Sequence, residues 1–272
     1  MKYSYVTYLG DDGYLQGTLG LIASLHVVKS KYPLLIMINK QGGVSKKIID
    51  YLQSINNVSV KLIEPIVAND NIARENENSN QPKWTNTFSK LKIFDFTDYD
   101  KLVFLDSDML VVSNLDNLFE RKNMSAVSAD AEYPGNDYHE LNSGLLVIVP
   151  KKGESERLLN LVPTTSDTPI GDQDILHSGF PFWRNTPDLH LGSEYNVFVN
   201  HVDYYRKHIW KKTNEKVIHF VGPQKPWQLS PVQSFLFILK KTIWWRPCTI
   251  KYFLVYRKLI RDNLKKYQDY GN

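Results

Sequence analysis

An apolar run that ends on two carboxylates, at residues 101–108 of the 272-residue chain, most constrains what this chain can fold into. Residues 101–105 read Lys-Leu-Val-Phe-Leu, which predicts a strand buried on both faces of a parallel sheet covered by helices. Asp106 and Asp108 must emerge at the edge of that layer, because burying carboxylates inside it is costly. Ligands of open α/β sheets bind at this edge. The pair is therefore a candidate for holding a divalent cation and nucleotide phosphates, and the alternative is a solvated turn.

The Asp-x-Asp spacing does not by itself select this pair, because it occurs three times. The three copies are Asp98/Asp100, Asp106/Asp108 and Asp172/Asp174. Asp98 and Asp100 precede the strand, so they lie at the opposite edge of the sheet and are discarded as ligands. The third copy stands at the start of an apolar helical turn.

The first 62 residues alternate strand and helix patterns, with the strands expected at 3–9, 34–38 and 58–62 and the helices at 14–31 and 45–54. This succession predicts a parallel sheet with right-handed crossovers, a nucleotide-binding half of Rossmann type. The first turn lacks Gly-x-Gly-x-x-Gly, which argues against a dinucleotide dehydrogenase. Residues 69–81 are nearly all polar and predict a mobile loop.

Composition narrows the class of protein further. A chain of this length can bury one large α/β domain, alone or with an appendage. The single cysteine, Cys248, excludes an internal disulfide framework and fits a reducing compartment. No stretch approaches the roughly 20 apolar residues that span a bilayer, and the N-terminus does not resemble a signal peptide. A cytoplasmic location is expected.

A second candidate ligand lies far along the chain. The strand pattern at residues 216–220 contains His219, and Gly222, two prolines and Lys225 follow it. A histidine at such a place is most often structural. The alternative is a stiff loop that presents the imidazole to a metal and the ammonium of Lys225 to a phosphate.

Five motifs in this order resemble glycosyltransferase family 8, within it the glycogenin-like branch and also the bacterial lipopolysaccharide galactosyl- and glucosyltransferases. They are YVTYLGDDGY, SKLKIFDFTDYDKLVFLDSDML, LNSGLLV, GDQDIL and HFVGPQKPW, and the resemblance covers roughly residues 3–227. It implies a GT-A fold, an α/β architecture with a Rossmann-like, mostly parallel central sheet.

The resemblance also implies roles for individual residues. Asp106, Asp108 and His219 would hold Mn²⁺, with Mg²⁺ as a substitute. The UDP-sugar would contact Thr7, Leu9, Tyr14, Lys90, Ser107, Gly222 and Lys225. Asn142, Asp172 and Gln173 would surround the sugar as catalytic residues. Three of these positions have structural alternatives: packing for Tyr14, a solvated loop lysine for Lys225 and a helix N-cap for Asp172.

The implied activity is transfer of a hexose, from UDP-glucose first and UDP-galactose next, with retention of anomeric configuration. The expected acceptor is a glycan or a lipid-linked saccharide. One alternative is a glycogenin-like primer that glucosylates its own Tyr204 or Tyr205. Another is a sugar-nucleotide-binding scaffold without turnover.

The expected domains are a GT-A catalytic domain at 1–230, with its nucleotide-binding half at about 1–110, and a helical extension at 231–272. Residues 235–270 carry nine lysines and arginines against two aspartates, interleaved with aromatic residues. This pattern predicts peripheral contact with the inner face of an anionic membrane, and the alternative is packing of the aromatic residues on the catalytic domain. Nucleic acid is not an expected partner, and a second copy of the chain is an open alternative.

Overall fold

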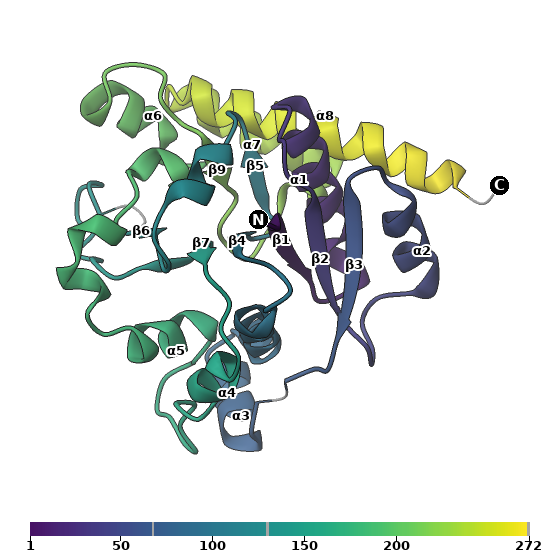
Figure 1. Ribbon diagram of the computed structural model, residues 1–272. Coiled ribbons are helices and arrows are strands. Elements are labelled where there is room, and N and C mark those ends of the chain that lie inside the picture. The colour runs from purple at the N-terminus through teal and green to yellow at the C-terminus, as the bar shows by residue number, and fades with distance from the viewer. Residues whose placement is uncertain (67, 129–130, 271–272) are drawn as a thin grey trace.

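The computed structural model describes residues 1–66, 68–128 and 131–270, and it begins with the expected alternation of strands and helices (Figure 1). The elements are β1 (Tyr3–Leu9), α1 (Leu15–Val27), β2 (Leu34–Asn39), α2 (Lys46–Ser54), β3 (Val58–Ile63) and β4 (Lys101–Leu105). Strands β1 to β4 are parallel and belong to a six-stranded sheet of order β3-β2-β1-β4-β7-β6. Hydrophobic clusters cover both faces of this sheet, as the unbroken apolar strands predict.

The sheet changes direction beyond β4. Strand β7 (Asn142–Ile148) pairs with β4 in antiparallel fashion, and β6 (Ala126–Val127) continues that edge. A second sheet of order β5-β9-β8 is built from β5 (Met109–Val111), β9 (Val217–His219) and β8 (Val197–Phe198). The prediction of a mostly parallel, Rossmann-like central sheet is confirmed.

The mobile loop expected at residues 69–81 is wrong, because α3 (Asp70–Asn78) forms there. Asn69 caps this helix by accepting a hydrogen bond from the Ile72 backbone N–H at 3.0 Å. The side chains of Ile72 and Asn76 are fully buried, and Asn76 bonds to both main-chain groups of Ile170. The partners that order this polar segment are distant in sequence, so its composition does not reveal them.

The remaining helical segments lie between these strands and helices along the chain. They are η1 (Asp12–Tyr14), η2 (Pro82–Asp95), η3 (Asp116–Glu120), α4 (Glu154–Leu159), α5 (Asp172–Gly179), η4 (Trp183–Asn185), η5 (Pro187–Leu189), η6 (Ser193–Tyr195), α6 (Val202–Tyr204), the π-helical η7 (Tyr205–Ile209) and η8 (Pro226–Gln228).

The chain closes with α7 (Pro231–Ile243) and α8 (Pro247–Asp269), and residues 271–272 of the expected extension lie outside the described residues. In Figure 1, α8 runs across the top of the molecule beside α1. One face of α8 is buried through Tyr252, Phe253, Tyr256 and Ile260. The alternative of packing on the domain therefore holds for α8.

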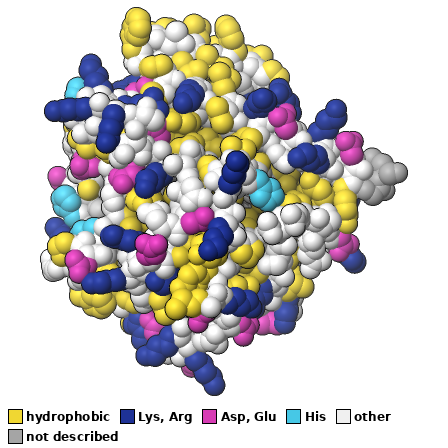
Figure 2. Space-filling model, turned by 45° about the horizontal axis from the view of Figure 1, so that its top comes forward, with side chains coloured by type: hydrophobic (Ala, Val, Ile, Leu, Met, Phe, Trp, Pro, Cys, Tyr) yellow, Lys and Arg dark blue, Asp and Glu magenta, His cyan; other side chains and the backbone are white. Residues whose placement is uncertain are grey.

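Helix α7 differs, because large hydrophobic side chains on it and on the turn after it are open to solvent. They include Val232, Phe235 at 64%, Leu236, Leu239, Ile243, Trp244 and Trp245 at 87% exposure. Figure 2 turns the top of Figure 1 forward and shows hydrophobic side chains gathered at the upper edge of the molecule, with Lys and Arg side chains nearby. Within the described part of the chain, no helix combines the length and apolar character that crossing a bilayer requires.

Candidate active site

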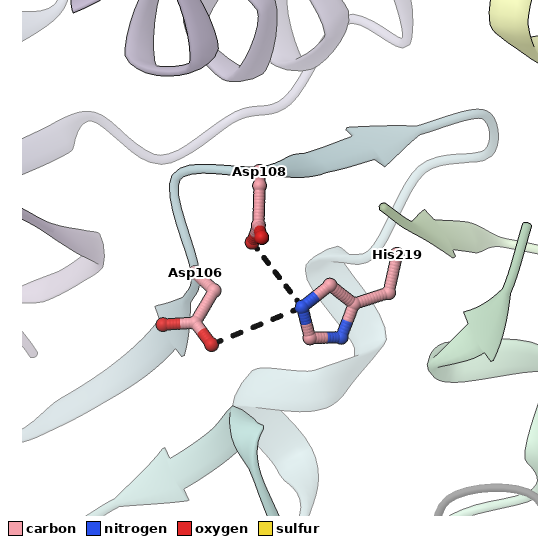
Figure 3. A group of neighbouring side chains, drawn as sticks. All are labelled: Asp106, Asp108 and His219. Carbon is pink, nitrogen blue, oxygen red and sulfur yellow. Dashed lines mark ion pairs between the residues drawn. The ribbon is translucent and has the colours of Figure 1, made fainter. Parts of the chain in front are cut away.

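Asp106, Asp108 and His219 meet at the carboxyl edge of the central sheet, and each turns a ligand atom toward the others (Figure 3). The three ligand atoms all lie within 4.8 Å of one another. Nε2 of His219 is 3.2 Å from Oδ1 of Asp108 and 4.0 Å from Oδ2 of Asp106. Two carboxylates and one imidazole form a donor set that suits Mn²⁺ or Mg²⁺, so the residues present fit the expected metal.

Strand pairing brings these residues together across more than a hundred positions. Asp106 follows β4, where its backbone N–H donates to the carbonyl of Gly144 at 2.9 Å. The chain then turns into β5, whose antiparallel register with β9 sets Met109 opposite His219. The backbone N–H of Phe220 donates to the carbonyl of Asp108 at 3.1 Å, and this bond holds the end of β9 next to the turn at residues 106–108.

Each aspartate also holds a lysine with its second oxygen. Lys90 Nζ lies 2.8 Å from Oδ1 of Asp106, and Lys225 Nζ lies 2.6 Å from Oδ2 of Asp108. Lys225 is buried and also donates to the carbonyl of Phe220 at 3.0 Å, so it is not the solvated loop lysine of the alternative interpretation. The site thus carries two cations within hydrogen-bond distance of its carboxylates.

Burial and these lysines shift the pKa values in different directions. Burial raises the pKa of Asp106 above its usual range, and the opposing charge of Lys90 does not cancel this effect. Burial would also raise the pKa of Asp108, but the facing His219 and Lys225 outweigh it and hold that pKa below its usual range. These neighbours of Asp108 therefore favour its carboxylate form, which is the form that binds a cation.

Asp172 lies next to the carboxylate–imidazole cluster, across Lys90 from Asp106. Its Oδ2 is 3.6 Å from Lys90 Nζ, and its side chain is buried at the start of α5. The N-cap alternative does not hold for Asp172, because Gly171 is the N-cap of α5 and the Asp174 carboxylate accepts its backbone N–H at 2.8 Å. The carboxylate of Asp172 therefore does not cap α5.

Gln173 and Asn142 lie together beside Asp172. Asn142 Nδ2 donates to Gln173 Oε1 at 3.1 Å, and Gln173 Nε2 donates to the Tyr138 hydroxyl at 2.7 Å. Sequence reasoning missed Tyr138, because no pattern distinguishes it from the other tyrosines of the chain.

The residues expected around the nucleotide are placed unevenly. The side chains of Thr7 and Leu9 are buried within β1, which leaves their main chain as the part that could face a ligand. Tyr14 is half-buried and packs edge-on against Trp227, with the two ring centroids 5.8 Å apart, as the packing alternative for Tyr14 predicts. Burial raises the pKa of Tyr14 to about 12, and the charges of Asp108 and Asp106 add to this effect.

Ser107 and Gly222 occupy turns next to the metal cluster. Ser107 is buried between the two aspartates, and its carbonyl oxygen lies 3.3 Å from the Tyr256 hydroxyl of α8. Gly222 has a φ of 106°, in a region that a side chain would make unfavourable, and a Cβ there would meet no other atom within 4 Å. Backbone conformation therefore explains the glycine in this loop.

Tyr204 and Tyr205 differ in exposure, which bears on the self-glucosylation alternative. Tyr205 is only 1% exposed and belongs to the hydrophobic cluster around β9. Tyr204 is half-buried and stacks on His208 with ring centroids 4.7 Å apart. Burial makes Tyr205 the poorer acceptor of the two.

A nucleotide-binding sheet whose carboxyl edge carries this carboxylate–imidazole cluster defines the GT-A class of glycosyltransferase. The chain belongs to glycosyl transferase family 8, whose sequence model matches residues 5–230. It is 31% identical to glycogenin-1 of Caenorhabditis elegans over 234 residues, which cover 84% of this chain and 51% of that protein. It is 28% identical to galactinol synthase 1 of Solanum lycopersicum over 273 residues, covering 89% and 80%.

A comparison of structures agrees with this fold. The galactosyltransferase LgtC, crystallised with donor and acceptor sugar analogs, superposes with a TM-score of 0.59 over 95% of both chains at 17% identity. The chain spans between about half and two thirds of the length of animal glycogenins, 51% of the Caenorhabditis elegans protein and 65% of the Mus musculus protein.

Proposed function

We propose that this chain is a metal-dependent, retaining hexosyltransferase that moves a sugar from a UDP-sugar to a glycan or lipid-linked saccharide. The observation that carries the proposal is that Asp106, Asp108 and His219 converge at one edge of the sheet. Lys90, Lys225 and Asp172 lie beside them there. Membership of the family supports a UDP-sugar donor and a divalent metal. Mn²⁺ is the favoured metal, with Mg²⁺ as a substitute, and UDP-glucose is favoured over UDP-galactose.

The proposed residues divide the work between the diphosphate and the sugar. Bound at Asp106, Asp108 and His219, the metal would stabilise the negative charge that develops on the departing UDP. The ammonium of Lys225 would pair with diphosphate oxygens, close to the carboxylate that now holds it. Thr7, Leu9, Tyr14, Ser107 and Gly222 would line the remainder of the nucleotide site.

The anomeric configuration would be retained because the acceptor oxygen attacks C1 of the sugar from the same face that the diphosphate leaves. The bond from the sugar C1 to the β-phosphate oxygen breaks, the acceptor oxygen bonds to C1, and the acceptor proton passes to that phosphate oxygen. Asp172 and Gln173 would position the sugar and stabilise its positive charge, and Asn142 would support Gln173. Trapping a covalent sugar adduct on Asp172, seen by mass spectrometry of the working enzyme, would overturn this scheme in favour of double displacement.

A donor screen tests the proposal directly. UDP release is measured with UDP-glucose, UDP-galactose and N-acetyl analogues, with Mn²⁺ and with EDTA. We expect release only with the metal, and we expect Asp108→Ala to abolish it while the far-UV circular dichroism stays unchanged. Full activity in Asp108→Ala, or activity that EDTA does not remove, would refute the proposed metal site. Absence of release with every donor would favour the non-catalytic scaffold.

The self-glucosylating primer is tested by intact mass. Incubation with UDP-glucose and Mn²⁺ adds hexose units to the chain if Tyr204 or Tyr205 is an acceptor, and Tyr204→Phe removes them if the more exposed tyrosine is used. An unchanged mass excludes this alternative.

We further propose that α7 and the turn after it lie against an anionic membrane, which would bring the site to a lipid-linked acceptor. Lys240 and Lys241 stand between the exposed Leu239 and Ile243 of α7, and Lys240 Nζ lies 4.5 Å from the centroid of the Trp244 ring. Exposed apolar surface beside cations suits the interface of an anionic bilayer. We expect the chain to sediment with phosphatidylglycerol vesicles, and to stay in the supernatant when Phe235 and Trp245 are both replaced by Ser.

A further inference from the structure

A continuous line of side-chain amides connects the metal cluster to the sugar side of the site. His219 Nδ1 lies 2.9 Å from Asn196 Oδ1, and Asn196 Nδ2 donates to Asn142 Oδ1 at 2.7 Å. Asn142 Nδ2 in turn donates to Gln173 Oε1 at 3.1 Å. Asn196 is 1% exposed, so solvent cannot replace its two partners. A buried amide of this kind has one favourable orientation, and its neighbours determine it.

Two backbone N–H groups at the start of β7 set the direction of the whole line. The N–H of Ser143 donates to Gln173 Oε1, and the N–H of Gly144 donates to Asn142 Oδ1, both at 3.0 Å. A backbone N–H can only donate, so the atoms that it meets must be oxygens. The Asn142 amide nitrogen then faces Gln173, and its oxygen faces the amide nitrogen of Asn196.

The donor-to-acceptor direction of these hydrogen bonds also determines how Asn196 bonds to the imidazole of His219. Asn196 has its nitrogen toward Asn142, so its oxygen faces His219 and can only accept a hydrogen bond. Nδ1 of His219 therefore carries the proton of this hydrogen bond, which leaves Nε2 as the nitrogen that can offer a lone pair to a metal. Nε2 is the atom turned toward Asp106 and Asp108. Metals bind neutral imidazole through such a lone pair, and the partner of the other nitrogen sets which nitrogen is available.

We propose that Asn196 is a positioning residue that fixes the metal-binding tautomer of His219 and ties it to the sugar-side amides Asn142 and Gln173. The proposal rests on the metal site proposed above. The role assigned to Asn196 is separate from that of any acceptor tyrosine. It also predicts that metal and sugar sites share one hydrogen-bond network, whose direction comes from the backbone of β7.

Replacing Asn196 by Ala tests the first half of the proposal. We expect Mn²⁺ affinity, measured by the electron paramagnetic resonance of free Mn²⁺, to fall about 10- to 100-fold. In the metal-free protein, ¹⁵N NMR of labelled histidines should show Nδ1 of His219 protonated and hydrogen-bonded in the wild type, and that hydrogen bond should be lost in the variant. The matched control is Asn200→Ala, four residues away, whose side chain accepts one exposed hydrogen bond from Lys241. Unchanged Mn²⁺ affinity, or an unchanged Nδ1 signal of His219, in Asn196→Ala would overturn the proposal.

Asn196→Asp separates the metal from the sugar. A carboxylate still accepts the Nδ1–H bond, so we expect the tautomer to persist and Mn²⁺ to bind at least about tenfold more tightly than in Asn196→Ala. It has no hydrogen to donate to Asn142, so the KM for the UDP-sugar should rise while Mn²⁺ affinity is kept. Loss of the tautomer in both variants would contradict the proposal. Near-ultraviolet circular dichroism checks that both variants fold. If the wild type itself binds no Mn²⁺, the proposed function fails, and the tautomer measurement on metal-free protein still decides the role of Asn196.

Discussion

Tyr256 of α8 provides the sharpest test of how the C-terminal helix supports the site. Its side chain is fully buried and stacks on Phe220 with ring centroids 4.4 Å apart. The hydroxyl lies 3.3 Å from the carbonyl oxygens of Gly17 and Ser107, so it contacts the backbone between Asp106 and Asp108. The backbone of α1 comes close because Gly20 has no side chain there, and a Cβ on it would lie 2.5 Å from the Tyr256 ring.

The expected magnitudes follow from what each substitution removes. Tyr256→Ala leaves a large cavity against α1 and β9 and should lower the free energy of unfolding by about 3–5 kcal/mol. Tyr256→Phe keeps the packing and loses only the hydroxyl, so a loss of about 0.5–1.5 kcal/mol is expected. Urea denaturation followed by tryptophan fluorescence measures both. Because Ser107 lies between Asp106 and Asp108, Tyr256→Ala should also weaken Mn²⁺ binding.

The matched control is Leu254→Ala on the same helix, whose side chain is 49% exposed and whose replacement should change stability by less than about 0.5 kcal/mol. Equal stability of Tyr256→Ala and the wild type would refute the docking of α8. It would also leave the expected boundary at residue 230 as a division between a self-sufficient domain and an appendage.

Three further predictions concern single groups. Burial raises the pKa of the Cys248 thiol to about 11, so at pH 8 only about 1 in 1000 molecules carries the thiolate. Alkylation by iodoacetamide should therefore be slow at pH 8, and its rate should rise as the pH approaches 11. Rapid labelling at pH 8 would contradict this prediction. Gly144→Ala would set a Cβ 2.8 Å from Cε1 of His219, so Mn²⁺ affinity should fall at least about tenfold, and unchanged Mn²⁺ resonance would contradict it. Burial would raise the pKa of Glu215, but hydrogen bonds from Arg206, Tyr252 and nearby backbone N–H groups together outweigh it and lower the folded pKa. These contacts therefore stabilise the protein above the ordinary pKa of 4.5, and the benefit is lost as pH falls through the lowered value; Glu215→Gln should remove that pH dependence of the unfolding midpoint.

The part of this protein that could be predicted from sequence is the part governed by local patterns. The apolar run before Asp106 is buried β4, the alternation over the first 62 residues is a parallel sheet, and the family resemblance is confirmed. Strand geometry also placed Asp98 and Asp100 at the edge away from the site, where Asp100 accepts from the backbone N–H of Lys2. The strand assignments and the placement of Asp98 and Asp100 depend on periodicity and on the cost of burying charge, and the family resemblance depends on five motifs. None of these requires knowledge of distant neighbours.

The aromatic, basic C-terminal segment needed the tertiary structure. Its composition is similar throughout, yet Tyr252 and Tyr256 are buried against the domain while Phe235 and Trp245 are open to solvent. The difference depends on which helix packs against α1: α8, which carries Tyr252 and Tyr256, does so, whereas Phe235 lies on α7 and Trp245 on the turn after it. The polar segment at 69–81 was misjudged for a similar reason, since the partners of Asn76 lie 94 residues away.

The sequence by itself determined which chemical groups the site contains, and only the tertiary structure decided how those groups are oriented. Asp106 and Asp108 were visible at a strand end, but their meeting with His219 depends on the pairing of β5 with β9 across more than a hundred residues. The role proposed for Asn196 depends on two backbone N–H groups of β7. Ligand types follow from local chemistry, whereas the direction of a hydrogen bond depends on atoms that only the folded chain brings within reach.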